Sequence, residues 1–324
     1  LGDRRLIAQF QSLSSFTNFN FIYFNLQHRV QTGFALFDDR TFFIGIDNRG
    51  EFERGRRVFR QTGALALASY PLSRYYRLEG QIGYISRKFD FPFIIRNNEG
   101  TQFFAVDARS DNFPTAGVSF VGDTVLYEEW GPLSGRRFQL SYSYSPNFSP
   151  DDDNPETPLN ENSSTLSSDI TVDLRHYFKI TQRSLIAVRL FGARSTGSFP
   201  NVYYFGGLDT LRGLDFREQI GNTIGYANFE YRFPLIDILA TPILTFRDIR
   251  GQVFLDVGGA ALEGAPFQFW DSNERQLVNG VAAYGFGFQI GLLGLQLHWD
   301  FAKEWDFKKT LSGLKTSFYI GTQF

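Results

Sequence analysis

The residues best placed to do chemistry are an arginine inside a glycine-rich segment and an aspartate on a later strand. Segment 199–222 reads FPNVYYFGGLDTLRGLDFREQIGN and carries Arg212 between two strand-like stretches. In segment 252–258, alternation places Asp256 on the face opposite the aliphatic one. A carboxylate in a confined interior is costly unless it is paired, and a guanidinium can bind it through two parallel hydrogen bonds. Two interpretations stay open: Arg212 binds Asp256, or Arg212 lies on an exposed loop and Asp256 contacts only water.

The other arrangements that catalysis or metal binding would need are weak or missing in the sequence. The histidines, His28, His176 and His298, are far apart and have no neighbour at metal-ligand spacing. Cysteine is absent, which excludes disulfides, thiolate zinc sites and a cysteine nucleophile. No G-x-S-x-G elbow, phosphate loop or zincin helix occurs. We therefore predict that the chain is not an enzyme and has no metal and no cofactor.

Two groups of acidic residues could take part in catalysis or bind a metal, and each also has a simpler interpretation. Asp169 with Asp173, or His298 with Asp300, could form acid and base pairs, but polar side chains are the expected filling of a barrel interior. The aspartates at 151–153 could bind Ca²⁺, but their spacing matches no defined calcium loop. A solvated charge run is the simpler interpretation of that segment.

Composition favours a membrane barrel. The formal charge of −2 and the absence of a Lys/Arg-rich block argue against nucleic acid as a partner. Aromatic residues make up 17% of the chain, yet mean hydropathy is −0.22 and no window holds 18 apolar residues in a row. Many aromatics without a continuous apolar run are typical of a transmembrane β-barrel, because each strand shows apolar residues on one face only. Since Leu1 is not an initiator Met and no signal peptide is visible, the chain looks like the remainder of a longer protein.

Strict alternation of apolar and polar residues recurs along the chain, as in 168–179 and 293–301. Turn signals between such runs predict about fourteen strands. They are expected at 4–13, 19–29, 31–38, 57–70, 74–88, 102–127, 136–147, 167–179, 184–196, 223–233, 244–261, 278–291, 294–304 and 315–324. Tight turns at 70–73, 131–135, 181–183 and 292–293 alternate with long polar loops at 39–56, 89–101, 148–166, 197–222 and 262–277. Short turns on one side and long loops on the other are characteristic of outer-membrane barrels.

Three sequence features carry a resemblance to a known family. They are Gly206-Gly207 followed by Leu-Arg-Gly-Leu at 211–214, Phe-Leu-Asp-Val-Gly at 254–258, and the terminal Phe324. In these the chain resembles the C-terminal barrel of the BamA/TamA-type outer-membrane insertase and translocase superfamily, also called the bacterial surface antigen family. That family carries V-R-G-F/Y in an inserted loop and F-x-D-x-G on the next strand but one. Phe254, Asp256 and Gly258 match in full, whereas Leu replaces the family's Val and aromatic around Arg212 and Gly213.

The resemblance implies a fold and a pairing. It implies an all-β, transmembrane antiparallel β-barrel whose long loop folds into the lumen, with Arg212 paired to Asp256. Five strands follow the loop, as the family requires, but the family has sixteen strands. We therefore expect residues 1–324 to form a single transmembrane barrel domain that lacks its first hairpin and any N-terminal periplasmic domain. The strand at 281–291 has small residues on one face, which would leave space for the loop backbone.

The last strand carries a further predicted signal. Residues 315–324 alternate, with Phe318, Ile320 and Phe324 on one face. A C-terminal aromatic on such a strand resembles the signal by which barrels are recognised for outer-membrane assembly. An ordinary closing strand that happens to end in Phe is the alternative.

The resemblance implies that the chain, in the outer membrane of a Gram-negative-type envelope, helps client polypeptides enter or cross that membrane. Its partners would be the lipid bilayer, client polypeptides and a periplasmic accessory domain or subunits, with no nucleic acid. A passive channel or a membrane anchor for a fused periplasmic domain is the alternative function. A soluble β-sandwich is the alternative fold.

Overall fold

The structure is a computed structural model, and it describes residues 2–12, 17–46, 52–96, 102–148, 164–208, 210–242, 244–263, 265–292 and 295–321. Every regular element in these ranges is a β-strand. In the described part of the chain, no helix is both long and apolar enough to span a membrane. The aspartates at 151–153, the greater part of the predicted loop 148–166 and Phe324 lie outside the described residues.

The long strands are β1 (Arg4–Ser12), β2 (Thr17–Asn25), β3 (Gln31–Ile46), β4 (Phe52–Pro71), β5 (Tyr76–Arg96), β6 (Gln102–Asp123), β8 (Gly131–Pro146), β9 (Thr165–Lys179), β10 (Leu185–Thr196), β13 (Thr223–Ala240), β14 (Thr245–Ala261), β17 (Gly280–Leu292), β18 (Leu295–Trp305) and β19 (Lys315–Ile320). The short ones are β7 (Leu126–Glu128), β11 (Tyr203–Phe205), β12 (Gln219–Gly221), β15 (Trp270–Asp271) and β16 (Gln276–Leu277).

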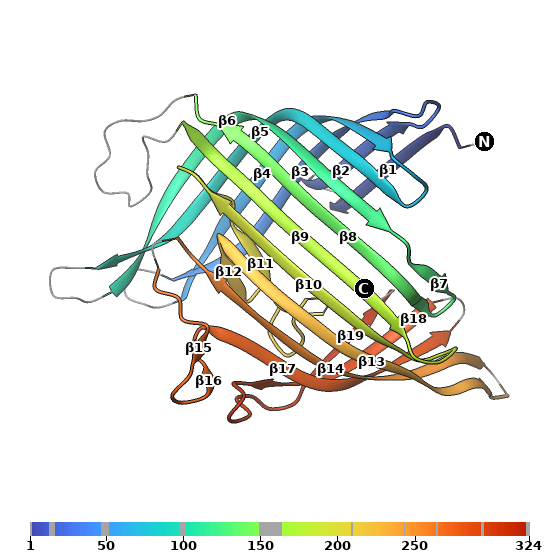
Figure 1. Cartoon of the computed structure of the whole chain (residues 1–324). Helices are drawn as coiled ribbons and strands as arrows, with labels where there is room; N and C mark the ends of the chain where they lie inside the picture. Colours follow the sequence, from blue (N-terminus) through green and yellow to red (C-terminus); the bar gives the residue numbers. More distant parts are fainter. Residues whose placement is uncertain are drawn as a thin grey trace. The chain divides into compact units, whose positions relative to one another are not determined.

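The fourteen long strands follow one another in sequence order within one sheet (Figure 1). They correspond one to one to the strands predicted from alternation, so that prediction is confirmed. The strand β7 pairs with β8 off this path, while β11 with β12 and β15 with β16 form separate hairpins inside the predicted loops 197–222 and 262–277.

The chain divides into two compact units. Unit 1 holds Leu1–Phe120, Ser141–Ser168 and Gly197–Phe199, and unit 2 holds Val121–Leu140, Asp169–Thr196 and Pro200–Phe324. Within unit 1, β2, β3, β4 and β5 pair antiparallel in order. Within unit 2, β10, β13, β14, β17, β18 and β19 do the same, and this unit carries the candidate site.

Two of the predicted long loops, 39–56 and 89–101, are wrong. Their described residues, 39–46, 52–56 and 89–96, are all strand: β3 continues to Ile46, β4 begins at Phe52, and β5 extends to Arg96. Arg40, a charged residue of the predicted loop, binds the buried Asp38 on the same strand, and Asp38 also accepts hydrogen bonds from Arg60 across the pair of β3 with β4. One ion pair along β3 and one across to β4 therefore help to keep this polar segment in the sheet.

The tight turn predicted at 131–135 is also wrong. These residues begin β8, and the turn lies at Glu129 and Trp130, between β7 and β8. The predicted strand 102–127 is interrupted after Asp123, whose carboxylate accepts a hydrogen bond from the amide of Val125. The remaining tight turns agree where they are described, since β4 ends at Pro71 and β9 ends at Lys179.

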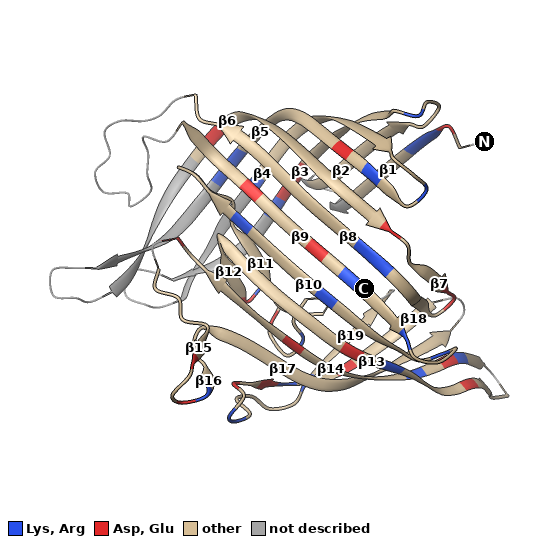
Figure 2. Ribbon diagram, in the orientation of Figure 1, with Lys and Arg blue, Asp and Glu red and all other residues tan. Residues whose placement is uncertain are grey.

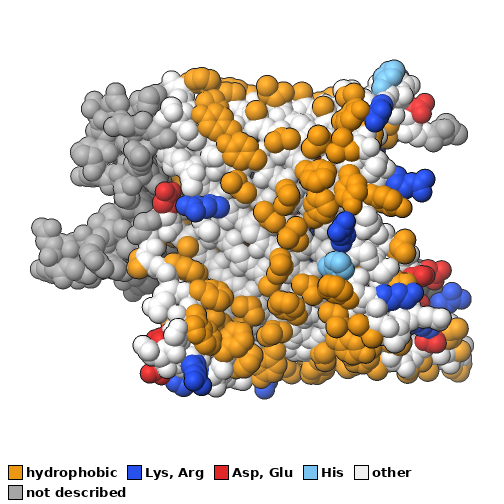
Figure 3. Space-filling view, in the orientation of Figure 1, with side chains coloured by type: hydrophobic (Ala, Val, Ile, Leu, Met, Phe, Trp, Pro, Cys, Tyr) orange, Lys and Arg blue, Asp and Glu red, His pale blue; other side chains and the backbone are white. Residues whose placement is uncertain are grey.

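The two faces of the unit 2 sheet differ as alternation predicted. On β14 the side chains of Phe254 and Asp256 are buried, whereas Val253 is 46% exposed. On β9, Asp169 and Tyr177 are buried while Ile170 is exposed. Charged residues lie along the middle of several strands (Figure 2), yet hydrophobic side chains are spread over the face seen in Figure 3 and few charged ones appear on it. The sheet therefore turns its polar face inward and its apolar face outward, the reverse of a water-soluble sheet packed on an apolar core.

Candidate functional site

The glycine-rich segment folds as a hairpin with an ordered tip. Phe205 and Gln219 form the last pair of β11 with β12, and the residues between them, 206–218, form the tip, of which 209 lies outside the described residues. Inside the tip, the amide of Gly207 donates to Leu211 O, and the amide of Gly206 donates to Thr210 Oγ1. Gly206, Gly207 and Gly213 all have positive φ, of 129°, 88° and 88°. Such backbone is open to glycine and strained for most other residues, so the glycines shape the tip.

The tip delivers Arg212 to Asp256 on β14. Arg212 Nε donates to Asp256 Oδ2 at 2.8 Å, and Nη2 donates to Oδ1 at 2.7 Å. The backbone amide of Arg212 adds a third bond to Oδ2 at 3.1 Å. Arg212 is 2% exposed and Asp256 is 0% exposed. The predicted pairing is therefore present, in the bidentate geometry that suits a buried guanidinium.

Three residues of β13 complete the polar network around Arg212 and Asp256. Arg212 Nη1 lies 2.7 Å from Glu230 Oε1, and Glu230 is also held by Arg232 at 2.6 Å. Asn228 Nδ2 donates to Asp256 Oδ1 and to Thr210 O, which joins the tip backbone to the same carboxylate. Burial alone would lower the pKa of Arg212, but Asp256 and Glu230 raise that pKa above its ordinary value. The loop arginine is thus charged and shared between two buried carboxylates.

The sequence prediction missed Asn228, Glu230 and Arg232. They alternate on one face of β13, and the strand register places Asn228 opposite Asp256 and Glu230 opposite Phe254. The period-two placement of these polar residues was visible in the sequence. The register that brings them to Asp256 was not, because the bulge at Pro234 sets the pairing of β13 with β14.

The aromatic residue of the matched motif also contacts the arginine. Arg212 Cζ lies 3.6 Å from the centroid of the Phe254 ring, so the guanidinium stacks on it. A cation over a buried aromatic face is attracted by the ring quadrupole. Phe254 thus holds the loop as well as packing beside Asp256.

Replacing Phe254 by leucine is expected to lower the free energy of unfolding by about 1 to 2 kcal/mol, because the cation–π contact is lost while an apolar side chain remains. Urea unfolding in lipid vesicles, followed by tryptophan fluorescence, measures this. The matched control is Phe286→Leu on the exposed face of β17. Equal effects of the two changes would contradict a special role for Phe254.

An apolar seat holds the tip beside the charges. Leu211 and Leu214 are buried in a cluster with Phe205, Ile224 and Ala283, among others. The two leucines that replace the family's Val and aromatic therefore fill the seat. Tight packing explains two glycines: a Cβ on Gly213 would lie 3.0 Å from Ala283 Cβ, and one on Gly258 would lie 2.8 Å from Tyr226 Cβ.

The small residues predicted on β17 do line the seat. Ala283 is fully buried, whereas Tyr284 and Phe286 on the opposite face are exposed. Ala302 on β18 is the second nearest neighbour of a Cβ built on Gly213. The loop backbone therefore approaches β17 and β18 where their side chains are smallest.

Other candidates lie away from this site. Phe318 and Ile320 are exposed on β19, so their role as an assembly signal stays a prediction. His28 and His176 are exposed, and His298 is buried and stacked on Tyr319 at 4.5 Å between ring centroids. Among the described residues, no cluster of His, Cys, Asp or Glu is arranged to hold a metal ion.

Comparison with known proteins places this geometry in a fold class. No family model and no curated protein matches the sequence. Three solved structures each match 94% of the chain. BamA from Haemophilus ducreyi lacking POTRA domains 1-3 matches at 14% identity with a TM-score of 0.62, over 61% of its own chain. CdiB from Escherichia coli matches at 13% identity and 0.51, over 51%, and CdiB from Acinetobacter baumannii at 12% and 0.53, over 49%.

The chain therefore has the fold of the BamA/TamA-type β-barrels, and the predicted fold class and resemblance are confirmed at that level. It spans about half to three fifths of the length of these structures. At such low identity the likeness shows the fold alone.

Proposed function

We propose that this chain is an outer-membrane β-barrel that helps client polypeptides enter or cross the outer membrane of a Gram-negative-type envelope. The 206–218 tip would be its internal control element. The observation that carries the proposal is the buried Arg212–Asp256 pair, held by a loop inside a fold similar to that of BamA and CdiB.

The physical properties of the site suit a control element. A buried ion pair contributes little net stability compared with apolar packing, but it fixes one arrangement and is strongly disfavoured when half-broken. The tip also makes a contact at the start of β19, where Lys315 Nζ lies 3.3 Å from Asp215 Oδ1. A displaced tip would therefore change both the interior and the start of the last strand.

The outward face supports a lipid bilayer as the first partner. Exposed apolar residues on consecutive strands include Ile170 on β9, Leu190 on β10, Phe229 on β13, Val253 on β14 and Phe288 on β17. A water-soluble monomer rarely exposes an apolar surface this extensive. A lipid bilayer would cover this apolar surface and leave the buried polar network unchanged. A periplasmic accessory domain or subunit would be a further partner.

The function is tested by reconstitution. The purified chain in lipid vesicles is expected to accelerate several-fold the folding of a urea-unfolded eight-stranded outer-membrane barrel, read as heat-modifiable migration on gels. Arg212→Ala should reduce this acceleration, and Arg217→Ala on the same tip is the matched control. No acceleration by the intact chain would contradict the proposal.

The alternative, a passive channel or anchor, makes a different prediction. An intact chain that forms large, stable pores in planar bilayers without accelerating barrel folding would be a channel. An intact chain that does neither would be an anchor. A protein that stays soluble without detergent and shows no heat-modifiable migration would contradict the membrane assignment.

A further inference from the structure

A second element enters the interior of unit 2, from the end where the short turns lie. It is the turn at Glu129 and Trp130 between β7 and β8. Trp130 is 9% exposed and packs with Leu133, Tyr177 and Leu185, on β8 and the neighbouring strands β9 and β10. These contacts alone would place the turn against its own part of the sheet.

The same turn also contacts strands much further along the sheet. Gln289 Nε2 on β17 donates to Trp130 O at 2.7 Å, and Gln296 Nε2 on β18 donates to Glu129 O at 3.1 Å. In the sheet order, β9, β10, β13 and β14 stand between β8 and β17. The five strand-to-strand spacings from β8 to β17, of about 4.8 Å each, add up to about 24 Å along the sheet. A two-residue turn that lies in the plane of the sheet cannot reach that far. The turn therefore crosses the interior.

The third contact is with β14, the strand that also holds the loop tip. Arg250 Cζ lies 3.7 Å from the centroid of the Trp130 ring, and Arg250 Nη2 donates to Arg183 O at 2.6 Å. Arg250 is 2% exposed, and no ion pair involves it in the part of the chain that the structure describes. The indole ring thus stacks on a buried cation, a contact that gains strength when it is desolvated.

β14 therefore carries two matching contacts at different levels. Phe254 receives Arg212 from the loop tip, and Arg250 receives Trp130 from the turn. The two positions are four residues apart, or about 13 Å along the strand. Between them Gln252 donates a buried hydrogen bond to Asp300 on β18, passing over Gly287 of β17. The tip and the turn thus occupy the interior from opposite ends of one strand.

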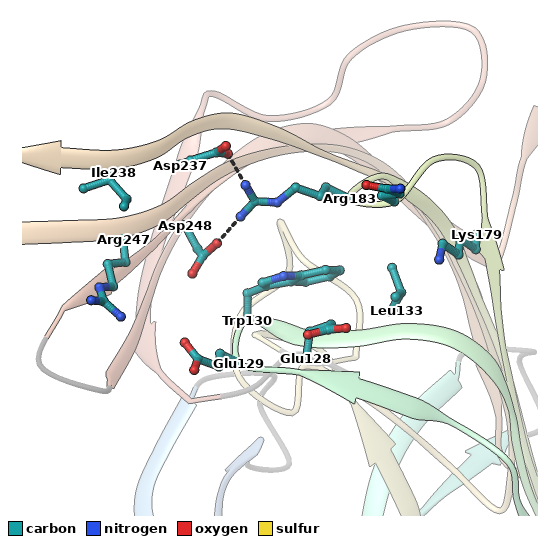
Figure 4. A pocket seen from close by; sticks show the side chains of 11 residues that line it. Glu128, Glu129, Trp130, Leu133, Lys179, Arg183, Asp237, Ile238, Arg247 and Asp248 are labelled. Atoms are coloured by element: carbon teal, nitrogen blue, oxygen red, sulfur yellow. Dashed lines mark hydrogen bonds and ion pairs between the residues drawn. The ribbon is translucent and has the colours of Figure 1, made fainter.

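A cavity gives the turn room to move. It measures about 810 Å³ and lies at the short-turn end, with Trp130 and Glu129 on one side and Arg183, Asp237 and Asp248 on the other. In Figure 4 the Trp130 ring lies between its own turn and Arg183, which is ion-paired with both aspartates. Displacing the turn into this space would break the two hydrogen bonds that Gln289 and Gln296 donate to it, and the stacking of Trp130 on Arg250. It would not break a pairing between the long strands.

We propose that the Glu129–Trp130 turn is a second closure of the barrel interior, with Trp130 on Arg250 as its latch. The loop tip closes the interior at one level and the turn closes it at the other. This inference rests on the proposed function in one respect, that the interior is a membrane passage to be closed. A polypeptide passing through the barrel would have to displace both elements.

Conductance of single molecules in planar bilayers tests the two closures together. Arg212→Ala and Trp130→Ala are each expected to give small, fluctuating currents, and the double variant a several-fold larger, stable current. Trp270→Ala, at a partly exposed tryptophan on β15, is the matched control and should leave the Arg212→Ala current unchanged. A double variant that conducts no more than Arg212→Ala would overturn the second closure, as would one that is folded and does not conduct.

A cross-link tests the turn without removing its packing. Because the chain has no cysteine, Glu129→Cys with Gln296→Cys introduces a single reactive pair. A short bismaleimide should link the two, and the link should return the current of the Arg212→Ala background to that of the unaltered chain. Absence of the link would overturn the inference. The proposed function is judged separately by the barrel-folding assay, so that assay can fail while the link forms, and the reverse.

Discussion

Replacing Arg212 by alanine is expected to lower the free energy of unfolding by about 3 to 5 kcal/mol, the usual cost of removing one partner from a buried ion pair. The change leaves Asp256 and Glu230 buried with a reduced set of donors: Asn228 and a backbone amide for the first, and Arg232 for the second. Urea titration in lipid vesicles measures the loss. Arg217→Ala, which removes an arginine stacked on Tyr204 in the same tip, should cost far less.

A charge exchange separates a direct pair from two independent effects. Arg212→Asp should impair folding more than alanine does, because it sets a third carboxylate beside Asp256 and Glu230. Adding Asp256→Arg should restore part of the loss, and only part, since Glu230 still faces the new aspartate and the shorter side chain reaches less far. Additive losses in this double-mutant cycle would show that the two residues do not interact.

Gly213→Val is expected to be the next most damaging single change, at about 2 to 5 kcal/mol, from backbone strain and overpacking together. Its φ of 88° disfavours a β-branched side chain, and a Cβ there would lie 3.0 Å from Ala283 Cβ and 3.3 Å from Ala302 Cβ. The tip should then leave its seat. The same vesicle titration measures the stability, and cleavage of the tip by added protease measures the release.

Two further variants resolve the cause. Gly313→Val is the matched control, because a Cβ at Gly313 meets nothing within 4 Å. Adding Ala283→Gly to Gly213→Ala should recover the part of the loss that comes from crowding and leave the part that comes from strain. If Gly213→Val and Gly313→Val were equally mild, the tip would not be packed against β17 and β18.

Much of the fold was predictable because a sheet with one apolar and one polar face must alternate. The fourteen long strands follow from that period together with the turn signals between the alternating runs. Their extents were harder to predict: Arg40 lies in a segment that resembles a loop in sequence, but on β3 it binds Asp38, which also binds Arg60 across the pair of β3 with β4. The sequence does not reveal which charges will meet across a strand pair, so a paired polar segment is mistaken for a loop.

The site, like the fold, was predictable only in part. The pairing of Arg212 with Asp256 was predictable because both residues lie in short motifs, and Gly213 marks the sharp backbone beside them. Glu230 was not, because its place next to Arg212 depends on the register of β13 against β14. The inward turn at Trp130 was hidden for a similar reason. Pro132 and Gly135 pointed to a turn a few residues away, and the amides that hold it come from Gln289 and Gln296, far along the chain.

The most direct test of the seated loop is a cross-link between Asp215→Cys and Lys315→Cys, positions that form an ion pair at 3.3 Å between the tip and the start of β19. The chain has no other cysteine, so any link comes from this pair. The seated loop predicts rapid linking by a short bismaleimide in vesicles, a large loss of linking when Arg212→Ala is added, and none when Thr316→Cys, on the opposite face of β19, replaces Lys315→Cys. Linking that is absent, or that is unchanged by Arg212→Ala, would contradict a tip held inside the barrel by Arg212 on Asp256.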